Sequence, residues 1–292
     1  MGYLMNTLKC PKLHVITGDL DDTLVATQNQ PERLRRESDE ALLQIGQLVT
    51  DLRTQSKAYF GSATGRSFAS IQELAAERPA FKQMLPIMDF HIASVGTAIY
   101  ARQKGATDFT HVPGWPRVGL WDRGAIAIIL STHPDLTAQE PAAQGEYKIS
   151  YRTESREETS LHASRLRWYL GQTASQAEII VSGHHPWRFV DVLPAGIHKG
   201  SALLQLPQLL ESDSGHTDIV VPEYSICRVA GGDSMNDQAL LAAADVAIIP
   251  SNAQPDLRNW AENTPLVGSL YTAEGHCAVG FLQGLRQHLY GS

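Results

Sequence analysis

The 292-residue sequence predicts an α/β protein in which a doubly wound parallel sheet is interrupted by an inserted α+β domain. Two observations lead to this prediction. Short β-rich segments alternate with amphipathic helical segments near both ends of the chain, and the middle of the chain lacks this alternation. The length also exceeds the usual span of about 100–200 residues for one domain, so two domains are expected.

The N-terminal part supplies the first strand–helix repeats. The helical segments carry apolar residues at spacings of three and four, whereas the strand-like segments are short and end at glycine, serine or threonine. This pattern predicts a strand at 13–18, a helix at 31–54, a strand at 57–61, a helix at 68–77 and a strand with a hairpin at 90–100.

The C-terminal part repeats the same rhythm. We expect a strand at 226–230, a short helix at 237–244, a strand at 246–249 and a helix at 273–289. Strands that alternate with helices favour a parallel sheet covered on both faces. Ligands of such sheets bind at the carboxyl ends of the strands, so the polar clusters that follow the strands should converge there.

The middle of the chain is richer in proline, tryptophan, histidine and arginine. Strand-like runs at 147–151, 179–182 and 189–193 surround a single helical segment at 159–172, which favours an antiparallel sheet. We therefore expect a core formed by residues 1–104 and 196–292, with an inserted domain at 105–195.

The composition narrows the classes of function. Apolar residues make up 43% of the chain and the formal net charge is −7, which argues against disorder and against a nucleic-acid partner. No apolar run approaches the length of a membrane span or a signal peptide, so a cytoplasmic protein without a membrane partner is expected. The widely spaced Cys10, Cys227 and Cys277 form neither a disulfide framework nor a zinc pattern, and are predicted to be small buried side chains. The histidines outside the inserted domain, such as His14 and His91, are predicted to be core or surface residues.

Two acidic clusters follow predicted strands. Asp19 and Asp21 lie two residues apart after the first strand, and Asp233 and Asp237 flank Asn236 after a later one. A helix cap or a turn explains one such cluster, but buried like charges at this spacing are costly unless a cation or proton compensates them. Carboxylate oxygens from both clusters would suit Mg²⁺.

Two further segments favour an anion. Thr64 and Arg66 lie where a helix is expected to begin, and Lys199 is predicted to lie on a glycine-flanked turn. Each segment by itself is more often only a turn. Their order along the chain, between the two acidic clusters, is more informative.

That order resembles the haloacid dehalogenase superfamily, whose motifs are a D-x-D-x-T/V loop, a Ser/Thr loop, a lysine and a G-D-x-x-N-D loop. The matching residues in this chain are Asp19, Asp21, Thr23, Thr64, Lys199, Asp233, Asn236 and Asp237. The resemblance implies a Rossmann-like core and a cap. It also implies that Asp19 is a nucleophile that forms an aspartyl-phosphate, and that Asp21 acts as general acid and base.

The resemblance assigns roles to the remaining motif residues. Thr64 and Lys199 would hold the phosphoryl oxygens. The implied Mg²⁺ site uses Asp19, the backbone carbonyl of Asp21 and Asp233, with Asn236 and Asp237 in support. The predicted metal-site residues are therefore Asp19, Asp21, Asp233 and Asp237.

The spacing of the motifs selects a subtype. Far more of the chain lies between Thr64 and Lys199 than between Thr23 and Thr64. The inserted domain therefore follows the second motif, which resembles the type IIB cap of sugar phosphatases. Asp21 is present, whereas dehalogenase members lack the second aspartate, so the resemblance implies hydrolysis of a phosphate ester.

Within that group the sequence is most similar to the sucrose-6-phosphate phosphatase family. The similar segments are 146–151, 180–184, 191–194, 198–200, 251–257 and 274–280. Where the family is expected to have a lysine after Ser-Gly in the cap, this chain has His184 and His185. Sucrose-6-phosphate is thus the expected substrate, with mannosylfructose phosphate or a broader range of sugar phosphates as alternatives.

Cap residues are candidates for sugar recognition. Lys148, Ser182, His184 and Arg188 could hydrogen-bond to sugar hydroxyls. Trp115, Trp121 or Trp187 could stack on a ring, although packing in the core of the cap is the preferred prediction for each tryptophan. The full predicted substrate-binding set is Thr23, Gly65, Arg66, Lys148, Ser182, His184 and Asn236.

A different class of function stays open. Sugar-phosphate synthases can carry domains of this fold, so the chain could be a catalytically silent partner of such a glycosyltransferase. A silent domain has no need of all four motifs, which favours the enzyme. An enzyme could also bind a synthase.

Overall fold

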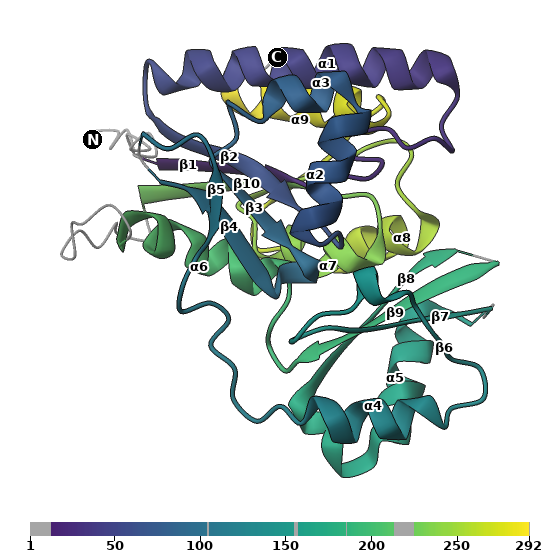
Figure 1. Cartoon of the computed structure of the whole chain (residues 1–292). Coiled ribbons are helices and arrows are strands. Elements are labelled where there is room, and N and C mark those ends of the chain that lie inside the picture. The colour runs from purple at the N-terminus through teal and green to yellow at the C-terminus, as the bar shows by residue number, and fades with distance from the viewer. Residues whose placement is uncertain (1–12, 104, 155–156, 185, 213–224, 292) are drawn as a thin grey trace, which may run out of the picture.

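The computed structural model describes residues 13–103, 105–154, 157–184, 186–212 and 225–291. Cys10 and His185, for which the sequence led to predictions, lie outside these ranges. Within them the chain forms one sheet of eight strands and one of four, which lie in separate parts of the molecule (Figure 1).

The large sheet has the predicted doubly wound character. From edge to edge its strands are β12 (Ser269–Thr272), β11 (Val246–Ile249), β10 (Ile226–Gly231), β1 (Leu13–Gly18), β2 (Lys57–Ala63), β3 (Phe90–Ala93), β4 (Ala98–Arg102) and β5 (Phe109–His111). The pairings from β12 to β3 are parallel, and β4 and β5 continue the sheet in antiparallel register. The strand order reverses at β1, so the loops after β1, β2 and β10 are neighbours.

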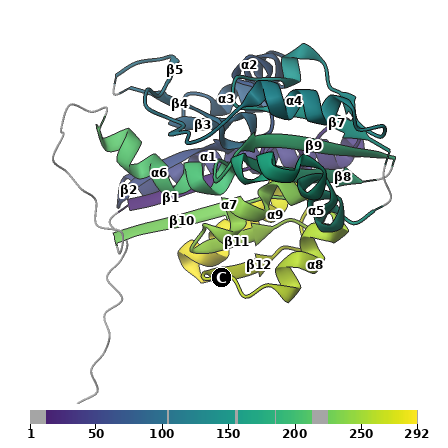
Figure 2. The same ribbon diagram turned by 90° about the horizontal axis from the view of Figure 1, so that it is seen from below.

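Helices cover both faces of this sheet (Figure 1, Figure 2). One face packs against α1 (Glu32–Arg53), α2 (Phe68–Glu77), α3 (Pro79–Met84) and α9 (Cys277–Tyr290), and the other against α6 (Lys199–Ser212), α7 (Gln238–Ala242) and α8 (Pro255–Asn263). Leu42, Ile45 and Val49, from the apolar stripe that predicted α1, are fully buried. None of the helices in the described ranges is long and apolar enough to cross a membrane.

The small sheet is antiparallel throughout. Its strands, in order, are β6 (Thr137–Ala138), β7 (Ile149–Thr153), β9 (Trp187–Pro194) and β8 (Ala177–His184). The helices α4 (Arg123–Ser131) and α5 (Thr159–Leu170) pack against one face through a separate apolar cluster. The other face is turned toward the large sheet (Figure 1). We call this small sheet and its two helices the cap.

Short 3-10 helices connect these elements, at η1 (Ser94–Gly96), η2 (Pro141–Ala143), η3 (Gly171–Gln176) and η5 (Met235–Asp237). The predicted turn at Lys199 is wrong, because this residue begins α6. Of the two glycines that suggested the turn, Gly196 does lie in a turn, just before α6, with a positive φ of 75°. Gly200 is instead required by packing, since a Cβ atom there would lie 2.1 Å from the Ala239 carbonyl oxygen.

The predicted start of the insertion at residue 105 also needs correction. The strand β5 pairs with β4, so the large sheet continues to His111. Its three residues are exposed or half-buried at the sheet edge, and therefore carry no apolar alternation that a sequence pattern could reveal. The strands β6 to β9 all lie within the range expected for the insertion.

Close approach of β2 and β3 gives a test of the core packing. A Cβ atom on Gly61 would lie 2.2 Å from the Phe90 carbonyl oxygen. We expect Gly61→Ala to lower the free energy of unfolding by about 1–3 kcal/mol, measured by urea denaturation. Gly119→Ala is the matched control, since a Cβ atom there meets nothing within 4 Å. Equal stability of the two variants would contradict the packing described for this pair of strands.

Candidate active site

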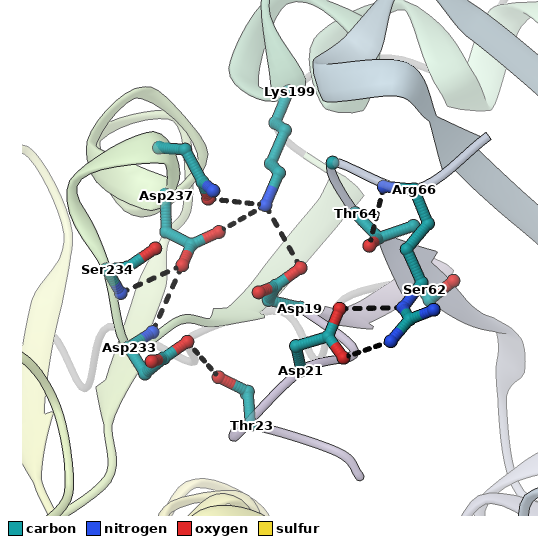
Figure 3. A network of polar contacts seen from close by, with 12 residues as sticks. Asp19, Asp21, Thr23, Ser62, Thr64, Arg66, Lys199, Asp233, Ser234 and Asp237 are labelled. Carbon is teal, nitrogen blue, oxygen red and sulfur yellow. Dashed lines mark hydrogen bonds and ion pairs between the residues drawn. The ribbon is translucent and has the colours of Figure 1, made fainter. Parts of the chain in front are cut away.

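The polar clusters predicted from the sequence meet at one edge of the large sheet (Figure 3). Asp19 directly follows β1, Thr64 follows β2, and Asp233 lies in the loop after β10. Lys199 approaches the same point from the first turn of α6. These segments are far apart in the chain, and parallel register of β1 with both β2 and β10 brings them together.

The Lys199 ammonium lies at the centre of this cluster. Its Nζ donates to Asp19 Oδ1 at 3.0 Å, to Asn236 Oδ1 at 2.7 Å and to Asp237 Oδ1 at 2.7 Å. The side chain is fully buried, and all three donor positions of the ammonium are used. The lysine therefore connects the loop after β1 with the loop after β10.

Asp237 is completely engaged by the protein. Its Oδ1 accepts from Lys199, and its Oδ2 accepts from the backbone N–H groups of Asp233 and Ser234, each at 3.1 Å. Together with the Ser234 side chain it forms a capping box at the start of η5. These bonds hold Asp233 in place at the end of β10.

Asp19 and Asp233 retain acceptor capacity. Thr23 Oγ1 donates to Asp233 Oδ1 at 3.2 Å, and Lys199 is the donor to Asp19. Among the described residues, the second carboxylate oxygen of Asp19 and of Asp233 has no side-chain or backbone donor. Both residues are buried and both line the cavity described below.

Burial sets the charge of this site. Desolvation, reinforced by Asp237 and Asp21 and opposed by Lys199, raises the pKa of Asp19 to about 8. Desolvation with the charges of Asp237 and Asp19 also raises the pKa of Asp233. Burial by itself would lower the pKa of Lys199, but the adjacent carboxylates outweigh it and the net direction is upward.

These charges fit a divalent cation. Ligand oxygens of Asp19, Asp233 and Asp237 lie within 4.8 Å of one another, and one ammonium faces these three carboxylates. When all are ionised, two negative charges stay uncompensated at a buried site. Carboxylate oxygens are the ligands that Mg²⁺ prefers, so the donor set suits this ion.

Asp21 lies beside this cluster in an ion pair. Arg66 Nε and Nη2 donate to the two oxygens of Asp21 at 2.8 and 2.7 Å. The Arg66 backbone N–H donates to Thr64 Oγ1 at 3.2 Å, and its Nη1 donates to Ser70 Oγ at 3.0 Å. Arg66, predicted to contact the substrate, is thus engaged with Asp21 and joins the loops after β1 and β2.

A cavity of about 610 Å³ opens between this cluster and the cap. Its volume is in the range of small-molecule sites. From the core, six predicted site residues line the cavity, namely Asp19, Asp21, Gly65, Arg66, Asp233 and Asn236. Thr23, Thr64, Lys199 and Asp237 are buried behind these residues and are not part of its lining. The cap contributes Gln139, Lys148, Ser182, Gly183, Phe189 and Asp191.

Alternation along the cap strands explains which cap residues face the cavity. In β7 and β9 alternate side chains, among them Ile149 and Val190, pack against the cap helices. The side chains between them point to the other face of the sheet. Register pairs Ser182 with Phe189 across β8 and β9, so both lie on the cavity side. One face of the small sheet is therefore apolar and the other is adapted to a polar ligand.

Lys148 connects the cap to the core. Its Nζ donates to the Gly65 carbonyl oxygen at 3.1 Å and lies 3.4 Å from Asp191 Oδ1. Ser150 Oγ donates to the same Asp191 oxygen at 2.6 Å. The lysine and the aspartate are both buried, so the predicted sugar-binding lysine has two protein partners in this structure.

The other residues of the cap that were predicted to bind the sugar differ in whether they line the cavity. Ser182 is buried and lines the cavity, as predicted for a substrate contact. His184 ends β8 opposite Trp187, and its side chain lies outside the described part of the structure. Arg188 does not line the cavity: its Nη1 donates to Asp256 Oδ2 at 3.0 Å, which pairs the cap with α8.

The aromatic residue at the cavity is Phe189, which the sequence analysis did not select. Trp121 packs against the apolar cluster of the cap, as predicted. The prediction is wrong for Trp115, which is buried beneath the large sheet, where its Nε1 donates to the Gly96 carbonyl oxygen. Trp187 is 42% exposed and lies against Arg152 rather than in the cavity.

Several polar residues of the cavity were also not predicted, among them Asp191 and Gln254. Asp191 faces the cavity from β9, and Gln254 reaches it from the segment before α8, where its backbone N–H donates to the Asp233 carbonyl oxygen at 2.7 Å. Gln254 Oε1 is buried without a partner among the described residues. An acidic residue at an alternating position of an otherwise apolar strand is the signal that could have identified Asp191.

Comparison with known proteins agrees with this geometry. The pattern of the family described as sucrose-6F-phosphate phosphohydrolase matches residues 12–289. The chain belongs to the sucrose-phosphatase family. This family is one of phosphoric monoester hydrolases, and all the core motifs described above lie within the matched range.

Curated relatives support this membership. The chain is 30% identical over 286 residues to a protein of Arabidopsis thaliana named probable sucrose-phosphatase 1, covering 96% of this chain and 61% of that protein. It is 30% identical over 277 residues to sucrose-phosphatase 1 of Nicotiana tabacum, covering 93% and 58%. The chain thus spans about three fifths of the length of these sucrose-phosphatase relatives.

Solved structures show the same fold. The sucrose-phosphatase of Synechocystis sp. PCC6803, determined in complex with sucrose and phosphate, aligns with a TM-score of 0.66 at 25% identity and covers 95% of this chain and 98% of its own. A haloacid dehalogenase subclass IIB sugar phosphatase, at 13% identity and a TM-score of 0.56, shares the architecture. The sucrose-phosphatase family therefore has the Rossmann-type core and cap found in this chain.

The raised pKa of Asp19 predicts a pH-dependent effect of Mg²⁺ on stability. Between the ordinary value of 3.8 and about 8, the metal-free folded state binds a proton that the unfolded chain has lost. Its free energy of unfolding should therefore fall as pH rises through this interval. Because Mg²⁺ replaces that proton, the rise in Tm on adding Mg²⁺ should be larger at the upper end of the interval.

Differential scanning fluorimetry across this pH interval checks the prediction. Asp233→Asn should abolish the Mg²⁺-dependent rise in Tm, and Asp51→Asn, on the exposed side of α1, should retain it. A rise in Tm that is the same at every pH, or that survives in Asp233→Asn, would count against this metal site.

Proposed function

We propose that this chain hydrolyses the phosphate monoester of a disaccharide, with sucrose-6-phosphate as the preferred substrate, through an aspartyl-phosphate on Asp19. The observation that carries the proposal is a buried Asp19 carboxylate that lines a cavity with a polar cap face and that, within the described ranges, accepts a hydrogen bond on one oxygen only, from Lys199. Membership of the sucrose-phosphatase family and the Synechocystis structure with sucrose and phosphate support the choice of substrate.

Asp19 would attack the phosphorus atom with its second carboxylate oxygen. The Lys199 ammonium lies 3.0 Å from the first oxygen, so it screens the negative charge of Asp19 as the dianionic phosphoryl group approaches. Thr64, buried at the end of β2, would donate its hydroxyl to a phosphoryl oxygen. The alcohol leaves, and water then hydrolyses the aspartyl-phosphate.

Asp21 would protonate the leaving alcohol and later activate the water. In this structure both of its oxygens accept hydrogen bonds from Arg66. Asp21 must therefore leave this pair, at least partly, before one of its oxygens can carry a proton to the substrate. Arg66 is in this proposal a positioning residue that holds Asp21 beside the site between turnovers.

Asp19, Asp233 and the backbone carbonyl of Asp21 would hold Mg²⁺. When bound, the ion would neutralise charge on the phosphoryl oxygens. Asp237 was also predicted to belong to the metal site. Because both of its oxygens already accept hydrogen bonds from the protein, we assign it a supporting role for Asp233 and Lys199.

The cap would select the sugar. Ser182 and Asp191 offer polar groups to sugar hydroxyls, and Phe189 offers an apolar face. Lys148 could move its ammonium from the Gly65 carbonyl oxygen to a ligand oxygen, because Lys148 and Gly65 both line the cavity that the ligand would occupy. Thr23 is not available for substrate, since its hydroxyl donates to Asp233.

The nucleophile is tested by Asp19→Asn. We expect kcat to fall by about 10³-fold or more, because the amide cannot form the aspartyl-phosphate. The wild-type chain, quenched in acid during turnover, should contain a hydroxylamine-sensitive phosphoenzyme that the variant lacks. Asp51→Asn is the control. Residual activity close to wild type in a folded Asp19→Asn chain would overturn the mechanism.

The substrate is tested by a panel of mono- and disaccharide phosphates. We expect kcat/KM for sucrose-6-phosphate to exceed that for monosaccharide phosphates by more than about tenfold, because the second ring contacts the cap. A higher value for mannosylfructose phosphate would replace the substrate and keep the mechanism. Equal values across the panel would indicate a broad phosphatase, and no turnover of any substrate with Mg²⁺ would favour a silent partner of a sugar-phosphate synthase.

A further inference from the structure

We propose that His14, Cys227 and His288 form a second metal site, selective for Zn²⁺ or a similar transition metal and separate from the active site. His14 and Cys227 are each the second residue of their strand, in β1 and β10. They lie at the amino-terminal edge of the large sheet, whereas Asp19 and Asp233 follow the carboxyl ends of the same strands.

The register of the sheet brings the first two ligands together. His14 and Cys227 are paired residues on adjacent parallel strands, so their side chains point to the same face. That face packs against α9, and Cys227 belongs to the same buried cluster as Leu285. His288 lies one turn further along α9, in its last turn, and so reaches the pair.

The distances suit a tetrahedral ion. Cys227 Sγ lies 3.5 Å from His288 Nε2, and one ligand atom from each of the three residues lies within 4.8 Å of the others. A Zn²⁺ ion with tetrahedral bonds of about 2.3 Å to sulfur and 2.0–2.1 Å to nitrogen places these two ligand atoms about 3.6 Å apart. The observed Sγ to Nε2 distance therefore needs little adjustment.

An unpartnered buried nitrogen provides an independent observation. His14 is only 7% exposed, and its Nδ1 has no hydrogen-bond partner among the described residues. A hydrogen bond between Cys227 and His288 would account for the 3.5 Å contact, but it leaves this histidine unexplained. A bound metal ion accounts for the convergence of all three side chains.

The protonation states agree with metal binding. Burial, followed by the charge of His288, lowers the pKa of His14, and burial also lowers the pKa of His288, so both imidazoles are neutral ligands. Burial and the charge of Asp245 raise the pKa of Cys227 to about 11, so the thiol binds a metal by releasing its proton. Asp245 acts on both Cys227 and His288, and its negative charge would stabilise a cation.

The ligand chemistry distinguishes this site from the active site. A thiolate with two imidazoles favours Zn²⁺ and its transition-metal relatives, whereas the oxygen ligands around Asp19 favour Mg²⁺. The ion would connect β1, β10 and α9, and so stabilise the docking of the C-terminal helix on the sheet. This inference does not depend on the proposed function.

Cobalt provides a direct test, because of the two metal sites proposed among the described residues this one has a thiolate ligand and the site around Asp19 has none. The full chain, stripped of metal and kept in excess Mg²⁺, is titrated with Co²⁺. We expect a thiolate-to-cobalt charge-transfer band that saturates at equimolar Co²⁺. Cys227→Ser should lose the band, and the matched variants Cys277→Ser and Cys10→Ser should retain it. No band in the wild-type chain, or a band that persists in Cys227→Ser, would overturn the proposal.

A second measurement separates metal binding from a hydrogen bond. Added Zn²⁺ should raise the Tm of the wild-type chain but not that of the His288→Gln variant. This substitution should leave the core intact, because the His288 side chain is partly exposed at the end of α9. Elemental analysis after gel filtration should find zinc bound to the wild-type chain only. If Zn²⁺ changes neither Tm nor metal content, the cluster is a hydrogen-bonded part of the core and the proposal fails.

Discussion

The buried ammonium of Lys199 is the interaction on which the active-site end of the molecule depends. A fully buried cation is tolerable only when its donors are satisfied, and Asp19, Asn236 and Asp237 satisfy them. Asp19 belongs to the loop after β1, and Asn236 and Asp237 belong to the loop after β10. The need to satisfy the buried ammonium therefore fixes β1, α6 and β10 relative to one another. Gly96 allows this arrangement, because a Cβ atom there would lie 2.5 Å from the Lys199 backbone nitrogen.

A second set of buried charges joins the cap to this core. Lys148 reaches the Gly65 carbonyl oxygen, and Arg188 pairs with Asp256 on α8. Polar contacts between cap and core, unlike an apolar interface, can exchange for ligand or water without exposing a hydrophobic surface. The cap is therefore held in place by contacts that a ligand or water can replace.

Strong periodic patterns in the sequence predicted most of the fold, but they did not predict its short or irregular elements. The stripe of Leu42, Ile45 and Val49 identified α1, because a long amphipathic helix repeats its signal over several turns. The exposed edge strand β5 and the start of α6 at Lys199 carried no such signal. In the site, the motif carboxylates could be identified because charged residues directly after a buried strand are costly unless they have a function. Phe189 and Gln254 could not, because in the sequence they resemble an ordinary packing residue and an ordinary loop residue, and only the cavity distinguishes them.

The amino-acid sequence by itself predicted a parallel core with an insertion, and it identified the candidate carboxylates, hydroxyl and lysine of the site, because strand periodicity and the order of motifs can be read directly along a chain. Only the tertiary structure decided how these groups are used. It paired Asp21 with Arg66, engaged both oxygens of Asp237, and brought His14 and Cys227 together with His288. Such pairings depend on strand register and helix docking, which place residues side by side regardless of their separation in the sequence.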